Sequence, residues 1–376
     1  MPRLQVRTKA RPHEYEITIG RGILSEVGGI ARERLGGQAQ RVALISNKRV
    51  FNLYGPTLMQ SLKANGFSVW SWLIGDGERH KSVRTMETVL SFLNDAGLDR
   101  GDAVIALGGG IVGDVAGFAA AVYLRGVPFI QVPTTLLAQV DSSVGGKTGV
   151  NLPAGKNLVG AFHQPAAVVI DIETLKTLPA REFVAGWCEC VKQGAVSNRN
   201  LFKLTTTFLK EFRAHEVLIS TQLEHLIASH CAFKASIVGA DEREDPIRRD
   251  RRSRRILNFG HTIAHALETV TNYRGLRHGE AVGHGILVAG QLSKNLGLLE
   301  PSELELLSQA VNLCGRLPST RRLDASAIVD AIAHDKKRAK GHVQWVLLER
   351  IGRPRIVSGK EISPLLLRNS VREALR

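Results

Sequence analysis

The alternation of apolar and polar residues changes its period along the chain. Residues 1–25 alternate with strand periodicity, in LQVRTKA and YEITIG, which predicts edge strands. From residue 41 onward come short apolar runs of the length typical of buried parallel strands, at 41–46, 68–74, 102–107, 128–132 and 166–171. Helical patterns separate most of these runs, so we predict an α/β region built on a mostly parallel, Rossmann-like sheet.

The second half of the chain shows helical periodicity instead. Apolar residues recur at helical spacing through 181–195, 199–240, 259–272, 280–296 and 302–314. One late apolar run, VQWVLLERIG at 343–352, predicts a further strand that returns to a sheet. We therefore expect an α/β domain over residues 1–180 and a mainly α-helical domain over residues 181–376, with the boundary around Leu178 and Pro179.

Composition is consistent with two domains and limits the classes of protein. The 376 residues are 44% hydrophobic, enough to bury a sizeable core. The chain has neither the roughly 18 consecutive apolar residues of a membrane span nor the start of a secretory signal. Its 4 cysteines do not suggest a disulfide framework, so we expect reduced thiols in a cytoplasmic protein with no membrane partner.

A formal net charge of +15 predicts an anionic partner, which can be nucleic acid, acidic lipid or a phosphorylated metabolite. The densest basic run lies at 247–255 and contains six arginines, of which Arg254 and Arg255 are the last. It can be a solvated loop, or it can turn one or more arginines toward an anionic substrate. Nucleic acid is not expected, because no aromatic residues interleave with the arginines and no binding motif accompanies them.

A glycine-rich turn follows the apolar run at 102–107. Gly108, Gly110 and Gly113 satisfy G-x-G-x-x-G between a predicted strand and a predicted helix, where exposed amides and the helix dipole can bind a pyrophosphate. The usual acidic residue is missing, because the next strand ends at Thr134 and Thr135. A dinucleotide site and a purely structural tight turn both remain open on this pattern.

Other strand ends favour a ligand crevice. Polar residues follow the runs at 41–46 and 68–74, in Ser46-Asn47 and in the segment 75–81 with sequence GDGERHK. In an open parallel sheet the carboxyl ends of the strands border the ligand crevice, so these residues together predict a polar one.

Two lysines lie in a second glycine-rich segment at 145–157. Lys147 follows two glycines, and Lys156 lies between Gly155 and Asn157. The segment is not a P-loop, since Asp141 stands where that motif requires its first glycine. We interpret it as a loop that brings two ammonium groups to an anionic ligand.

Histidines and one glutamate predict a metal site. His261 and His265 are four residues apart and share one face of a helix, His278 follows soon after, and Glu189 lies in an earlier helical stretch. Two imidazoles and one carboxylate with a coordination position left open form a catalytic divalent site. Spacing alone does not select the ligands. His265 or His284 can equally replace His261 or His278, and any single histidine can instead be a buried, hydrogen-bonded one.

Several segments together resemble the 3-dehydroquinate synthase family, in one order over roughly 40–352. They are DGERHKS, ALGGGIVGDVAGFAAAVYLRG, PTTLLAQVDSSVGGKTGVNLPAGKNLVGAF, CECVKQG, LNFGHTIAHALE, HGEAVGHG, HDKKRAKG and VQWVLLERIG. CECVKQG stands where the family usually has AEVIKYG, with glutamate, lysine and glycine kept. The segment 245–253 looks expanded and rich in arginine, and Ala264 stands where glycine is more usual.

The resemblance implies a set of site residues. Glu189, His261 and His278 would hold one divalent metal, zinc or cobalt. NAD would be held by Asp76, Gly77, Glu78, Arg79, His80, Lys81, Gly110, Ile111, Val112, Gly113, Asp114, Thr134, Thr135, Lys147, Lys156, Thr174, Leu175, Lys176 and Thr177. Substrate and catalytic roles would fall on Arg125, Asp141, Lys147, Lys156, Asn157, Lys192, Lys234, Glu244, Arg254, Asn258, His265 and Lys336 or Lys337.

The resemblance also implies a reaction. The family converts 3-deoxy-arabino-heptulosonate 7-phosphate to 3-dehydroquinate and phosphate through transient oxidation by NAD, phosphate elimination, reduction, ring opening and aldol closure. It acts in the shikimate pathway of aromatic amino-acid biosynthesis, typically as a cytoplasmic homodimer. Another sugar-phosphate cyclase and a metal-dependent polyol dehydrogenase of similar architecture are the alternatives.

Overall fold

The computed structural model describes residues 13–212, 220–338 and 343–375, with only the backbone at 334–338. The predicted edge strand in LQVRTKA lies outside these residues. A parallel six-stranded sheet organises the first half, with spatial order β1-β8-β5-β4-β2-β3. Its strands are β1 (Glu16–Gly20), β2 (Arg41–Asn47), β3 (Ser68–Ile74), β4 (Ala103–Gly108), β5 (Phe129–Pro133) and β8 (Ala167–Asp171).

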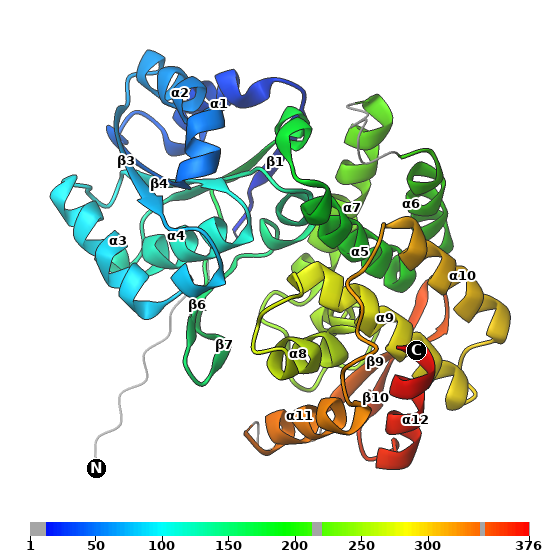
Figure 1. Cartoon of the computed structure of the whole chain (residues 1–376). Coiled ribbons are helices and arrows are strands. Elements are labelled where there is room, and N and C mark those ends of the chain that lie inside the picture. The colour runs from blue at the N-terminus through cyan, green and yellow to red at the C-terminus, as the bar shows by residue number, and fades with distance from the viewer. Residues whose placement is uncertain (1–12, 213–219, 339–342, 376) are drawn as a thin grey trace, which may run out of the picture.

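Helices cover both faces of this sheet (Figure 1). Successive residues of a strand point to opposite faces, so Leu44 packs in the apolar cluster beneath α2 while Ile45 packs in the cluster beneath α3 and α4. One layer contains η1 (Ile23–Glu26), α1 (Val27–Leu35) and α2 (Lys48–Ala64), and the other contains α3 (Val83–Asp95) and α4 (Gly110–Val122). This double layer confirms the predicted α/β architecture, since burial on both faces requires strands that are almost wholly apolar.

Short single-turn elements connect the strands to their neighbours. They are η2 (Glu78–His80), η3 (Tyr123–Arg125), η4 (Ala138–Ser142, a π turn) and η5 (Ile172–Thr177).

The second half is helical, as predicted, and is built around two buried helices. Its elements are α5 (Ala180–Ser197), α6 (Arg199–Glu211), α7 (Thr221–Ala240), η6 (Arg254–Asn258), α8 (His261–Val270), α9 (His278–Asn295), α10 (Pro301–Leu313), α11 (Ala325–Arg338) and α12 (Pro364–Ala374). Most residues of α5 and α9 are buried, because each helix packs against neighbours on several sides. No helix within the described ranges is long and apolar enough to cross a membrane.

The boundary between the halves lies between β8 and α5, but their cores are continuous. Val168 and Ile170 of β8 belong to the same apolar cluster as Trp187 of α5. The division at residues 180 and 181 therefore marks a change of secondary structure, and two independently folding units stay a prediction.

Two antiparallel pairs differ from the expectations. The run at 343–352 forms β9 (Gln344–Arg350), which pairs with β10 (Arg353–Ser358) in a separate two-stranded sheet within the helical half. It does not return to the large sheet, because the adjacent β10 supplies its hydrogen bonds. The glycine-rich segment interpreted as a loop is a hairpin of β6 (Lys147–Leu152) and β7 (Gly155–Phe162), which extends beside α8 (Figure 1).

Candidate active site

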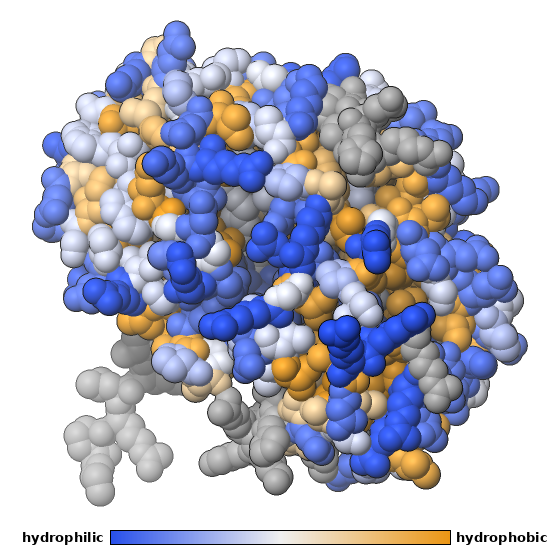
Figure 2. Space-filling model, in the orientation of Figure 1, coloured by the Kyte–Doolittle hydropathy of each residue, from blue (hydrophilic) through white to orange (hydrophobic). Residues whose placement is uncertain are grey.

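The sheet order brings the predicted cofactor segments to one edge. The loops after β8, β5, β4 and β3 all leave the carboxyl ends of parallel strands that lie in one row. This edge faces the helical half, and hydrophilic residues gather where the two halves meet (Figure 2). Such an edge is where open α/β sheets bind ligands.

The turn between β4 and α4 is too tightly packed for side chains. Gly109 is the N-cap of α4, and a Cβ built on it would lie 3.1 Å from Thr135 Cγ2. A Cβ on Gly110 would lie 3.1 Å from Ser142 Oγ, and one on Gly113 would lie 2.7 Å from Gln131 Oε1. The helix therefore begins with exposed amides and no competing side-chain cap, which is the arrangement that binds a phosphate.

Two predicted cofactor residues near this turn have side chains that are engaged within the protein. Val112 packs in the core cluster under α4, so only its backbone can face a ligand. Asp114 pairs with the buried ammonium of Lys81, with Nζ 2.5 Å from Oδ2. Burial raises the pKa of Asp114, although the charge of Lys81 opposes that rise.

The loop after β3 is open to solvent at its tip and anchored at its end. Asp76, Gly77 and Arg79 are exposed, and Arg79 Nε donates to His80 Nε2 over 3.1 Å. Glu78 Oε1 accepts a hydrogen bond of 2.8 Å from Asn151 Nδ2 on the hairpin. The loop and the hairpin are therefore held together beside the glycine turn.

Threonines after β5 and β8 have different surroundings. The hydroxyl of Thr134 is buried and has no hydrogen-bond partner within the described part of the chain. Thr135 Oγ1 accepts from the Ala138 amide over 3.2 Å. Thr174 Oγ1 donates to Asp171 O over 2.7 Å, and Thr177 Oγ1 lies 2.5 Å from the Tyr54 hydroxyl. The unpartnered Thr134 hydroxyl is thus a ready hydrogen-bonding group for a ligand.

The remaining predicted residues of η5 have side chains engaged elsewhere. Leu175 is fully buried in the main apolar cluster, and Lys176 forms an exposed ion pair with Glu173. Contact of either residue with a cofactor would therefore involve the backbone of Leu175 or a rearranged Lys176.

The hairpin brings both predicted anion-binding lysines to the crevice. Lys147 begins β6 and pairs with Glu244, and Lys156 is the second residue of β7, with its Nζ 2.9 Å from Glu268 Oε1. Asn157 has a positive φ of 53°, and its Oδ1 accepts from Lys81 Nζ. Both ammonium groups are held by carboxylates from the helical half, so the hairpin connects the two halves of the site.

Glu189, His261 and His278 converge from three helices. Each offers a ligand atom, and these atoms all lie within 4.8 Å of one another, with His278 Nε2 3.7 Å from Glu189 Oε1. Glu189 lies on α5, while the histidines begin α8 and α9. Glu189 is fully buried, and its Oε1 has no hydrogen-bond partner among the described residues. A buried, unpartnered carboxylate oxygen facing two imidazoles is the donor set of a divalent cation site.

The other two candidate ligands, His265 and His284, differ in how close they lie to the triad. The ring of His284 is turned away from the triad, and its Nε2 lies 2.8 Å from Pro318 O. His265 remains nearby, with its ring centroid 5.7 Å from that of His261 and 6.1 Å from that of His278. Burial and the neighbouring Lys192 lower the pKa of His261 well below its ordinary value, so its ring is neutral and able to bind a metal at neutral pH.

Two buried lysines and the carboxylate of Asp141 lie beside the triad. Lys192 Nζ lies 2.6 Å from Glu189 Oε2 and 3.9 Å from Asp141 Oδ2, and Lys234 Nζ lies 2.6 Å from Asp141 Oδ1. The contact between Lys192 and Glu189 is an ion pair. Burial alone would raise the pKa of Asp141, but Lys192 and Lys234 outweigh it and hold the pKa well below its usual range. Asp141 is thus ionised between two cations.

Arg254, unlike its neighbours in the arginine run, is buried. Its guanidinium donates to Gly145 O over 2.8 Å and to Glu242 O over 2.6 Å. Asn258 Nδ2 donates to Glu244 Oε1 over 3.2 Å, which places Asn258 beside the Lys147 pair. The run is mostly a solvated loop, with Arg249, Arg251 and Arg252 exposed, while Arg254 turns inward.

Arg125 is not brought into this group. Arg125 is exposed in η3, which precedes β5, and therefore lies toward the amino ends of the strands, because α4 runs back from the carboxyl end of β4. Within one chain it is separated from the crevice. Lys336 and Lys337 lie in α11, and their side chains are outside the described residues.

Glu268 was not singled out from the sequence, yet it contacts two predicted site residues. Its Oε1 lies 3.4 Å from His278 Nδ1 and 2.9 Å from Lys156 Nζ. Burial raises the pKa of Glu268, but the contacts with His278 and Lys156 outweigh it and lower the pKa to about 2. The available signal was spacing, because Glu268 follows His261 by seven residues and so shares its helix face.

Comparison with solved structures identifies the class of fold. A 2-deoxy-scyllo-inosose synthase complexed with carbaglucose-6-phosphate, NAD+ and Co2+ is 26% identical, with a TM-score of 0.83 over 96% of each chain. A 2-epi-5-epi-valiolone synthase from Streptomyces hygroscopicus with NAD+ and Zn2+ bound is 24% identical, with a TM-score of 0.86 over 98% of this chain and 99% of that one. The fold is that of the sugar-phosphate cyclases.

Sequence comparison narrows this class to one family. The models of the 3-dehydroquinate synthase N-terminal and C-terminal regions match residues 71–185 and 186–338. A 3-dehydroquinate synthase from Pelotomaculum thermopropionicum is 44% identical over 349 residues, which are 92% of this chain and 90% of that protein. The chain belongs to the 3-dehydroquinate synthase family and is an enzyme.

Proposed function

We propose that this enzyme converts 3-deoxy-arabino-heptulosonate 7-phosphate to 3-dehydroquinate and phosphate, using NAD and one divalent metal, zinc or cobalt. The observation that carries the proposal is the convergence of Glu189, His261 and His278 beside the carboxyl edge of the parallel sheet. A carboxylate, two imidazoles and an open position suit a catalytic zinc or cobalt ion. The family membership makes the heptulosonate phosphate the expected substrate.

The chain offers fitting groups for both cofactors. The buried, unpartnered Oε1 of Glu189 supports a cation between it and the two histidines. The side-chain-free start of α4 and the unpartnered hydroxyl of Thr134 support a pyrophosphate at the sheet edge. When bound, the cation supplies Lewis-acid polarisation of a sugar hydroxyl, and NAD supplies reversible hydride transfer.

Substrate anions would be bound by cations that now pair with carboxylates. Lys147 is held by Glu244 and Lys156 by Glu268, at the border between the hairpin and α8. An incoming phosphate or carboxylate can exchange with these acidic partners, and the charge-assisted bonds would orient the substrate. Asn157 and Arg254 flank the same region and would add hydrogen bonds.

Proton transfer is assigned to groups beside the metal ligands. His265 lies one helical turn after His261 and is suited to relay a proton. Asp141 is kept ionised by Lys192 and Lys234, so this group stabilises positive charge near the substrate and does not act as an acid at neutral pH.

One assay tests the proposed function. The purified protein is incubated with the heptulosonate phosphate, NAD and zinc, and phosphate release, product mass and absorbance of NADH are followed together. We expect stoichiometric phosphate and a product with the mass of 3-dehydroquinate, with no accumulation of NADH because hydride returns each turnover. Steady NADH production from a polyol would identify a dehydrogenase instead, and turnover of a different sugar phosphate would identify another cyclase.

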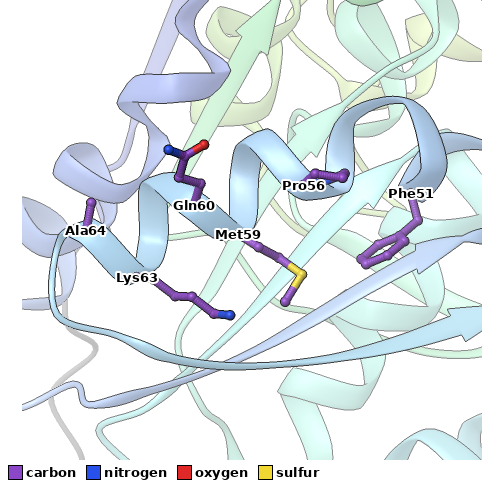
Figure 3. Close-up of a pocket in the computed structure, with 6 residues that line it drawn as sticks. All are labelled: Phe51, Pro56, Met59, Gln60, Lys63 and Ala64. Atoms are coloured by element: carbon purple, nitrogen blue, oxygen red, sulfur yellow. The ribbon is translucent and has the colours of Figure 1, made fainter.

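We further propose the homodimer and the cytoplasmic location that the family resemblance implies. β3 is an edge strand with exposed Trp70 and Leu73, and an unpaired apolar edge favours association. The adjoining α2 has a surface depression of about 660 Å³ that contains none of the predicted site residues, and Phe51, Met59 and Lys63 project from one side of that helix (Figure 3).

Trp70→Glu should lower the mass measured by light scattering from dimer to monomer, and a wild-type protein that is already monomeric would reject the dimer.

A further inference from the structure

Glu268 is a buried carboxylate between the metal triad and the hairpin. It lies on α8, is 2% exposed, and uses one oxygen for two contacts. Oε1 lies 3.4 Å from His278 Nδ1 and 2.9 Å from Lys156 Nζ, while Oε2 is buried and has no partner among the residues described. A carboxylate this deeply buried is costly unless it binds a cation or orients a neighbouring donor.

The two nitrogens of His278 face different groups. Nδ1 faces Glu268, and Nε2 faces Glu189 Oε1 at 3.7 Å. A carboxylate next to Nδ1 favours the tautomer that has its hydrogen on that nitrogen. The lone pair then remains on Nε2, the atom directed into the triad.

The arrangement also limits the motion of an otherwise accessible ring. The side chain of His278 is 36% exposed and stands at the first residue of α9, with its ring centroid 5.2 Å from that of His261. Glu268 comes from α8, the helix that also supplies His261. One helix therefore provides a ligand and holds the ring of the other.

We infer that Glu268 is a positioning residue that fixes the tautomer and orientation of His278 for metal binding and links this histidine to Lys156. The inference rests on the proposed metal site. Groups that receive the second N–H of a metal-binding histidine typically contribute 10–100-fold to metal affinity. Because Lys156 shares the same oxygen, Glu268 also holds the hairpin against the metal site.

The experiment measures cobalt and zinc affinity by competition with a chelator, together with the visible absorption spectrum of bound Co2+. Glu268→Ala should weaken binding by about 10–100-fold and alter the Co2+ absorption bands. Glu268→Gln keeps an acceptor for His278 Nδ1 and should recover part of the affinity. If circular dichroism shows that the alanine variant fails to fold, the glutamine variant tests the inference by itself. Its metal affinity should then be at least threefold lower than that of the wild type.

Three further variants separate the possible causes. Lys156→Met removes the same ion pair without touching His278, so its metal affinity should stay within about twofold of wild type. Glu303→Gln removes a carboxylate on α10 that pairs with Arg199 of α6 and should also leave metal affinity unchanged. His278→Ala should abolish tight binding.

The outcomes distinguish this inference from the metal site on which it rests. If His278→Ala binds metal as tightly as wild type, the metal site itself is wrong. If His278→Ala loses the metal while both Glu268 variants keep wild-type affinity and spectrum, only the role of Glu268 is refuted. An equal loss in Lys156→Met would assign the effect to the hairpin link and would overturn the role in positioning His278.

Discussion

Lys192 lies one turn after Glu189 on α5, and its ammonium nitrogen is 2.6 Å from Glu189 Oε2 in a fully buried environment. Burial lowers the pKa of Lys192, but Asp141 and Glu189 outweigh it and raise the pKa above its ordinary value. The lysine is therefore charged, and its charge partly compensates the buried carboxylate of Glu189. The charge of Lys192 would still compensate Glu189 Oε2 when a divalent metal binds Glu189 Oε1.

Replacing Lys192 should destabilise the metal-free protein strongly. Lys192→Met removes the ammonium group beside the buried carboxylate of Glu189, and breaking one side of a buried ion pair costs roughly 3–5 kcal/mol. Urea denaturation at neutral pH, with and without zinc, measures the change in the free energy of unfolding. The matched control is Arg353→Met, which removes an exposed ion pair with Glu349 and should cost no more than about 1 kcal/mol. Equal losses in the two variants would refute the compensating role.

Loss of one proposed ligand should remove both metal and turnover. We expect His261→Ala to retain less than one metal per chain after dialysis and to lose about 10³-fold in turnover, because Lewis-acid stabilisation supplies several kcal/mol. Elemental analysis and the phosphate-release assay give the two values. His284→Asn is the control, since the His284 ring faces Pro318 O and should not affect metal content. Retained metal and a normal rate in His261→Ala would reject the ligand assignment.

The buried His230 should make stability fall in acid. Burial lowers its pKa from 6.5 to about 3, with Nδ1 3.1 Å from Gln193 Oε1 and Nε2 3.0 Å from Thr205 Oγ1. Between these two pKa values His230 is protonated in the unfolded chain and neutral in the folded chain. Stability therefore decreases as pH falls below about 6.5. At pH 5 the expected contribution is a loss of ~2 kcal/mol relative to pH 7.

The comparison uses the same protein without this titrating group. His230→Gln should be less stable at pH 7 but should lose ~2 kcal/mol less than wild type between pH 7 and pH 5, as measured by denaturant unfolding. If the free energy of unfolding of the two proteins changed with pH in parallel, the pKa of His230 would not be lowered in the folded protein.

The arginine run should divide into one residue that matters for activity and several that do not. Arg254→Gln removes buried, charge-assisted hydrogen bonds to Gly145 O and Glu242 O and should lower kcat/KM by about 10–100-fold. Joint replacement of the exposed Arg249, Arg251 and Arg252 by serine should change kcat/KM less than about twofold at physiological salt, where exposed charges are screened. A large effect of the triple replacement would instead assign the exposed run to substrate capture.

Much of the fold was predictable because it depends on local periodicity. The apolar run at 68–74 coincides with β3, and the helical stretch at 181–195 lies within α5. Apolar residues repeat according to which face of an element is buried, so their spacing reports the backbone conformation. The hairpin of β6 and β7 was missed because Gly149, Gly155 and Gly160 interrupt its strand pattern. β10 was missed because its apolar positions are few and only its pairing with β9 makes it a strand.

The sequence by itself determined the elements, the parallel α/β class and a short set of candidate ligands that includes Glu189, His261, His265, His278 and His284. The spacing left these candidates open, and only the tertiary structure brings three of their ligand atoms together, by packing α5, α8 and α9, while the His284 ring faces Pro318 O. It also revealed Glu268 behind His278, and it separated Arg125 from the rest of the site within one chain. The physical reason is that spacing along one helix fixes which face a side chain occupies, whereas convergence depends on how remote helices pack.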